Sequence, residues 1–153
     1  AFSMAGADNT SAIAFGGNVS PKAQTESWNG TNWTEVNDMN TGRSGMGPAG
    51  TSTLALGAGG DTGPAADVTI TEQWNGTNWT EVNDLNTARL ILSGSGADNT
   101  SALAFGGNPD IASTELYNGT SWTNVSNLNT DIFSLDKFSL INCLYDFIEY
   151  ILY

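Results

Sequence analysis

Carboxylates and carboxamides are the side chains of this sequence that could do chemistry, because it contains no histidine and only one cysteine, Cys143. Without histidine, the usual general base and the Ser-His-Asp and Cys-His arrangements are excluded, and so are nearly all transition-metal sites. A lone cysteine cannot form a disulfide within the chain. We therefore expect no enzymatic activity and assign no catalytic residue.

Three glutamates recur at equivalent places, each two residues before an aromatic residue: Glu26, Glu72 and Glu115. Two carboxylates about 5 Å apart could serve a retaining glycosidase. These three belong to successive copies of one repeated block, however. The favoured interpretation is a structural role, in which each glutamate accepts hydrogen bonds from an arginine or from a neighbouring repeat.

The acceptor pattern for N-glycosylation, asparagine followed two residues later by serine or threonine, occurs nine times. Asn29, Asn75 and Asn118 form an equivalent set, because each begins an Asn-Gly-Thr triplet. Asn-Gly also favours a tight hairpin, since both residues readily take φ > 0. The turn is the favoured interpretation, and glycosylation of these three residues is the alternative.

Loop aspartates could supply oxygen ligands to Ca²⁺, a hard cation that takes six to eight of them. The four candidates are Asp8, Asp61, Asp98 and Asp110. Their spacing matches neither an EF-hand nor a nonapeptide calcium repeat, so ordinary Asx turns are favoured. We assign no metal ligand and expect no cofactor other than this candidate calcium.

The charge balance argues against nucleic acid as a partner. The 153 residues include 4 Lys and Arg against 16 Asp and Glu, which gives a net charge of −12 and no basic patch. Only 13% of residues are charged, yet five tryptophans and a 39% hydrophobic share are too many for a solvated coil. This composition favours one β-rich domain with many turns.

The elements that position these residues repeat along the chain. The segment GADNTSAIAFGGN at Gly6 returns with one change at Gly96, an offset of 90 residues, and the equivalent glutamates Glu26, Glu72 and Glu115 lie 46 and 43 residues apart. A period of 40 to 50 residues with several short strands is typical of propeller blades.

Turn chemistry places four short strands within one period. In the middle copy we predict strands over residues 51–56, 68–74 and 79–82 and a further run from 89 to 93. Asn75-Gly76 lies between two of them and predicts a tight hairpin that brings Trp74 and Trp79 together across the ladder.

These motifs resemble the kelch repeat, which has an arginine near its start, an apolar strand closed by Gly-Gly, a strand ending in an aromatic residue, and a hairpin to a tryptophan. The matching residues are Gly16, Gly17, Trp28 and Trp33 in the first copy, Arg43, Gly59, Gly60, Trp74 and Trp79 in the second, and Arg89, Gly106, Gly107, Tyr117 and Trp122 in the third. The Asn-Gly-Thr variant is similar to repeats in phage tail and bacterial surface proteins. The resemblance implies an all-β kelch-type β-propeller.

We divide the chain into three kelch-like blades at 1–130, with boundaries near 1–40, 41–86 and 87–130, and an apolar tail at 131–153. The tail lacks Gly, Thr and Trp, and its apolar residues follow helical spacing. It could cap the last blade, be an out-of-frame or truncated end without a role, or bind a membrane or partner. Asp146 and Glu149 argue against a spanning helix, and we expect no membrane partner.

Three blades do not close a ring, since closed propellers have four to eight, and each repeat buries its apolar face only against neighbours. We therefore expect a homo-oligomer, for example two chains with six blades, or further blades of a longer chain. The expected function is that of a non-enzymatic structural or adhesion module, extracellular or on a virion surface, with a glycan or protein partner. One alternative is a carbohydrate-binding propeller or inactive glycosidase relative, with tryptophans stacked on sugar. A second is an intracellular protein-interaction domain.

Overall fold

The computed structural model describes residues 2–18, 23–63, 66–108 and 112–129. Within this part, every regular element is a strand, and the strands form three four-stranded antiparallel sheets. The all-β prediction is confirmed, as is the number of strands in each period. The first sheet contains β1 (Ser3–Asp8), β2 (Ser11–Phe15), β3 (Thr25–Trp28) and β4 (Trp33–Val36). The second contains β5 (Gly47–Gly50), β6 (Ala55–Ala58), β7 (Thr71–Trp74) and β8 (Trp79–Val82). The third contains β9 (Ser93–Asp98), β10 (Ser101–Phe105), β11 (Thr114–Tyr117) and β12 (Trp122–Asn124).

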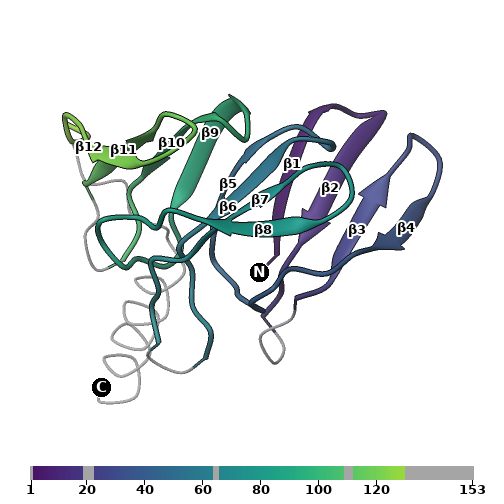
Figure 1. Ribbon diagram of the computed structural model, residues 1–153, viewed down its shortest axis with the longest axis horizontal. Helices are drawn as coiled ribbons and strands as arrows, with labels where there is room; N and C mark the ends of the chain where they lie inside the picture. The colour runs from purple at the N-terminus through teal and green to yellow at the C-terminus, as the bar shows by residue number, and fades with distance from the viewer. Residues whose placement is uncertain (1, 19–22, 64–65, 109–111, 130–153) are drawn as a thin grey trace, which may run out of the picture.

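The three sheets stand side by side like blades, as Figure 1 shows. Each is a meander in which strands pair in chain order. The first strands of the sheets are neighbours, because β5 contacts both β1 and β9. The later strands of each sheet lie progressively farther from this common centre (Figure 1).

The boundaries of the second sheet differ from the prediction. Residues 51–54 are the turn between β5 and β6 and not a strand, because the Thr51 N–H donates to the Leu54 carbonyl oxygen at 3.1 Å and closes the chain reversal. Gly50, with φ at +93°, starts that turn. The run from 89 to 93 is likewise a linker, and β9 begins only at its last residue.

The Trp74–Trp79 hairpin forms as predicted, with the two residues paired and their rings 5.6 Å apart. The turn is longer than a two-residue loop, because residues 75–78 connect the strands. Gly76 takes φ of +92°, but Asn75 is not among the residues with positive φ. Instead the Asn75 side-chain oxygen accepts the N–H groups of Thr77 and Asn78, both at 2.9 Å, and so closes the turn.

Each sheet has two different faces. We call the side that carries the aromatic pair the aromatic face and the opposite side the aliphatic face. The aromatic face of the second sheet packs on the aliphatic face of the first, in a cluster that includes Trp79, Ile13 and Phe15. The aromatic face of the third sheet packs in the same way on the second, where Trp122 lies in one cluster with Leu56. The hydrophobic core therefore lies between sheets.

The predicted tail helix at 131–153 lies outside the described residues. In the ranges that the structure does describe, no helix has the length and apolar character needed to cross a membrane.

Candidate assembly interface

Arg43 joins the first and second sheets, since its main chain is held by one and its side chain by the other. Its carbonyl oxygen accepts the N–H of Gly17, which follows β2 of the first sheet, at 3.0 Å. Its buried guanidinium donates to the carbonyl oxygens of Gly59 at 2.7 Å and Ile70 at 2.5 Å, both in the second repeat. An arginine suits this place because its planar head presents several donors in a fixed geometry.

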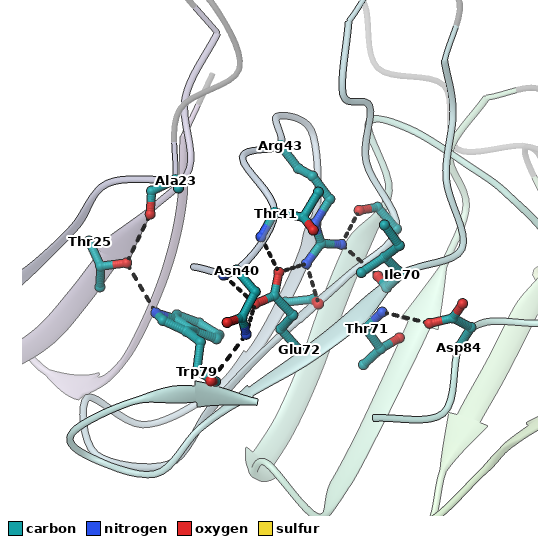
Figure 2. A network of polar contacts seen from close by, with 12 residues as sticks. Ala23, Thr25, Asn40, Thr41, Arg43, Ile70, Thr71, Glu72, Trp79 and Asp84 are labelled. Carbon is teal, nitrogen blue, oxygen red and sulfur yellow. Dashed lines mark hydrogen bonds and ion pairs between the residues drawn. The ribbon is translucent and has the colours of Figure 1, made fainter. Parts of the chain in front are cut away.

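Glu72 is the centre of the same junction (Figure 2). Its carboxylate accepts a charge-assisted bond from Arg43 Nη2 at 3.2 Å and one from the Thr41 N–H at 3.2 Å. Asn40 donates twice more, from its main-chain N–H at 2.8 Å and from its side-chain amide at 2.9 Å. These donors come from the linker between the sheets. The buried negative charge is thus compensated by one positive charge and by three neutral donors.

Burial lowers the pKa of the Arg43 guanidinium, and the facing Glu72 carboxylate opposes that shift. Arginine starts from so high a value that it keeps its charge inside the protein. The pair is therefore an ion pair with both side chains fully buried. Arg43 Nε is buried and has no hydrogen-bond partner in the described part of the chain, so one donor of the guanidinium is left unpaired there.

The junction between the second and third sheets repeats these contacts. The Arg89 carbonyl oxygen accepts the Gly60 N–H at 2.8 Å, and its guanidinium reaches the Gly106 carbonyl oxygen at 2.9 Å and the Glu115 carboxylate at 3.0 Å. Asn86 donates its main-chain and side-chain N–H groups to the same carboxylate at 2.7 and 2.8 Å. One design therefore holds both junctions.

Glu26, the equivalent acid of the first sheet, is exposed. Within the described ranges it has neither a hydrogen bond nor an ion pair. Of the three glutamates predicted to be equivalent, the structure thus places two in buried junctions and one on an open face. The three carboxylates belong to different sheets, each within its own β3, β7 or β11 strand.

The glycine doublets lie against the linkers. Gly16 has φ of +74°, and a Cβ there would come within 2.5 Å of the Arg43 carbonyl oxygen. Gly59, at φ of +67°, would likewise meet the Arg89 carbonyl oxygen at 2.8 Å. A side chain at either place would push the arginine main chain away from the preceding sheet, so glycine is required there.

The second aromatic residue of each pair also reaches the preceding sheet. Trp79 Nε1 donates to Thr25 Oγ1 at 3.1 Å, and Trp122 Nε1 donates to Thr71 Oγ1 at 3.1 Å. The first aromatic residues Trp28, Trp74 and Tyr117 pair with Trp33, Trp79 and Trp122 within their own sheets. No described sheet packs on the side of the first sheet that carries Trp33, which is 44% exposed, whereas Trp79 is 5% exposed.

The three Asn-Gly-Thr asparagines occupy equivalent exposed turns. The side-chain oxygens of Asn29, Asn75 and Asn118 each accept two main-chain N–H groups, at 2.9 to 3.0 Å. The side-chain oxygens thus close the turns. The amide nitrogens, which glycosylation would modify, make no hydrogen bond in the described part of the chain.

Two of the four loop aspartates, Asp8 and Asp98, make local turn contacts. Asp8 accepts the Thr10 N–H at 2.8 Å and its hydroxyl at 2.7 Å, and these bonds hold the pKa of this exposed carboxyl below its ordinary value. Asp98 makes the equivalent contacts, with the same effect on its pKa. Asp61 accepts the Ser44 hydroxyl at 3.1 Å, and Asp110 lies outside the described residues. No cluster of three metal-ligating acids, histidines or cysteines occurs among the residues with described positions.

Sequence reasoning missed the linker asparagines Asn40 and Asn86 and the acceptor threonines Thr25 and Thr71. A signal for the asparagines exists, since both copies of the linker read Asn-Thr-x-Arg. Sheets joined by such linkers define a repeat protein of blade-like units. No protein-family model matches this chain, and a search of curated proteins finds no match to it.

Proposed function

We propose that this protein is a non-enzymatic structural module of the kelch-type β-propeller kind, working in an adhesive or architectural assembly at a virion or cell surface. The observation that carries the proposal is the repeated junction, in which Arg43 with Glu72 and Arg89 with Glu115 join successive sheets by the same contacts. A unit built in this way adds neighbours without a new type of interface.

The chemistry of the junction supports a structural role over a catalytic one. The Glu72 carboxylate is fully buried and its oxygens accept hydrogen bonds from Asn40, Thr41 and Arg43, so it is out of reach of a substrate. Meanwhile the Asn-Gly turns project from the sheets as exposed polar loops. Rigid stacked sheets that present exposed turns are well suited to adhesion.

A chain with one additional sheet tests the modular role. A second copy of residues 41–86 is inserted after Asn86, which preserves the Asn-Thr-x-Arg linker at both new junctions. We expect this protein to unfold in one transition with a larger denaturant m-value and higher stability, because buried area and junctions both increase. Unfolding of the added sheet in a separate transition at lower denaturant would contradict the proposal.

Surface labelling of intact virions or cells that carry the protein tests the location.

One surface favours carbohydrate binding as a second candidate function. An open hollow of about 360 Å³ on the aromatic face of the first sheet is lined by residues that include Phe2, Gln24, Glu26 and Trp33. An exposed indole beside polar side chains suits the apolar and hydroxyl surfaces of a sugar. A glycan array read with the wild type and Trp33→Ala tests this function. Specific binding that is lost in Trp33→Ala supports it, and the absence of binding supports the structural module.

A further inference from the structure

We propose that two copies of this chain associate head to tail, with the aromatic face of the first sheet of one copy packed on the aliphatic face of the third sheet of the other. This inference rests on the proposed structural function and specifies its partner and its contact residues. The argument is that the two faces are the separated halves of a junction that the molecule already contains twice.

The first half is an acceptor buried without its donor. Thr114 is only 8% exposed, and its Oγ1 atom has no hydrogen-bond partner among the residues that the structure describes. Thr25 and Thr71 occupy the same register position in their sheets, and each accepts the indole N–H of a tryptophan from the next sheet. A buried hydroxyl left unpaired is unfavourable, and its sheet equivalents show which donor fits.

The matching donor is Trp33. It is equivalent to Trp79 and Trp122, which supply the two indole bonds inside the molecule. The Trp33 indole N–H makes no hydrogen bond within the described ranges. Placing the first sheet of one copy against the third sheet of another would bring this donor to the unpaired Thr114 oxygen.

A second polar pair is separated in the same way. The Leu128 N–H donates to the Ala112 carbonyl oxygen at 2.9 Å, as the Met39 N–H does to Ala23 at 2.8 Å. Asn40, the residue after Met39, donates its main-chain N–H to Glu72 of the next sheet. Asn129, the residue after Leu128, is exposed and has no acceptor in the described part of the chain. Its counterpart is the unpaired Glu26 carboxylate of a second copy.

The apolar surfaces follow the same rule. Leu103 is 38% exposed on the aliphatic face of the third sheet, whereas the equivalent Leu56 of the second sheet is 1% exposed beneath its neighbour. Met4, on the aromatic face of the first sheet, is also exposed. Covering both faces at once removes apolar area from water, which favours association.

Stoichiometry follows from blade number. Closed propellers contain four to eight blades, and six is the only multiple of three in that range. A two-chain ring with two identical head-to-tail contacts therefore contains six sheets and pairs the aromatic face of each first described sheet with the aliphatic face of a third one. Each contact has asparagine but no arginine opposite Glu26, since the sequence has Ile132 where the internal linkers have Arg43 and Arg89. We expect association to depend on concentration for that reason.

A complementation experiment on the full chain tests the contact by light scattering. Met4→Asp alters the aromatic end and Leu103→Asp the aliphatic end, and each side chain is exposed in the single chain, so circular dichroism is expected to show unchanged folding. Each variant alone should have the mass of one chain, 16.0 kDa, and their mixture should give a two-chain species through the one unaltered contact. Leu54→Asp, at an exposed position in the β5–β6 turn, is the matched control and should associate like the wild type.

The Trp33 bond gives a finer measurement. Trp33→Phe and Thr114→Val should each weaken association about 5-fold, and the double variant should weaken it little more than either alone.

Two results overturn the inference without touching the modular function. In one, the wild type has a single-chain mass at every concentration although the four-sheet chain folds. In the other, the Met4→Asp variant still associates by itself, which means that like faces pair. Failure of the four-sheet chain to fold cooperatively would instead refute the proposed function.

Discussion

The acid at the centre of each junction offers a comparison within one molecule, because the same substitution can be made where the carboxylate is enclosed and where it is open. Glu72→Gln replaces a fully buried carboxylate that faces Arg43. Glu26→Gln makes the same change at an exposed carboxylate without a partner in the described part of the chain. The difference between the two variants isolates the junction from the chemistry of the substitution.

The expected magnitude follows from the contacts of Glu72. Its carboxylate accepts four hydrogen bonds, two from Asn40, one from Thr41 and one from Arg43. The amide nitrogen of the glutamine is itself a donor and could not accept the hydrogen bonds that the carboxylate accepts. The Arg43 guanidinium would stay buried without its counter-charge. Breaking a buried pair in this way costs about 3–5 kcal/mol. The exposed Glu26→Gln is expected to change stability by about 0.5 kcal/mol or less.

Urea unfolding followed by tryptophan fluorescence measures both variants, at a protein concentration low enough to keep single chains. Equal effects of Glu72→Gln and Glu26→Gln would refute the reasoning that the junction stabilises the fold. The double variant Arg43→Met/Glu72→Gln provides a further check. It should be more stable than the sum of its single effects predicts, because no buried charge is left unpaired.

Three further changes have expected outcomes. Ile91 is a β-branched residue at φ of +55°, so Ile91→Gly should raise the free energy of unfolding by about 1 kcal/mol in the same urea assay, and a loss of stability would contradict the strain. Trp79→Phe removes a buried hydrogen bond between the first and second sheets and should lower the free energy of unfolding by about 2 kcal/mol. Trp33→Phe should lower it far less, and similar losses in the two variants would contradict this expectation. Hydrogen bonds from Thr100 hold the pKa of Asp98 below its ordinary value of 3.8, so the stabilising contribution of the carboxylate is present above pH 3.8 and is lost as the pH falls through the lowered pKa. The melting temperatures of wild type and Asp98→Asn should therefore converge in acid, and a constant difference would contradict this linkage.

The repeat period is what made the fold predictable from the sequence. Three registered copies identify equivalent residues, and the Asn-Gly dipeptide between Trp74 and Trp79 is a local signal strong enough to specify a hairpin. The exact strand limits were less predictable. In residues 51–54 the apolar alternation indicates a strand, but the turn that begins at Gly50 prevails there.

The junctions were only half predictable. A structural role for Glu72 and Glu115 follows from their recurrence, yet the different state of Glu26 does not, because it depends on which sheet precedes it in space. The Thr25 hydroxyl shows the same limit. Its partner, Trp79, lies 54 positions away in sequence, and threonine within a strand carries no sign of which donor it will meet.

The path of the main chain through Arg43 has a mechanical consequence. The first and second sheets are connected by the linker that contains this residue, so a force that separates them is transmitted along the same segment whose carbonyl oxygen is held by Gly17 and whose guanidinium is held by the second sheet. Pulling therefore loads a hydrogen-bonded anchor on each side of one residue before it reaches the hydrophobic contacts. The same anchor occurs at the next joint, since the Arg89 carbonyl oxygen is held by Gly60 and its guanidinium by the third sheet.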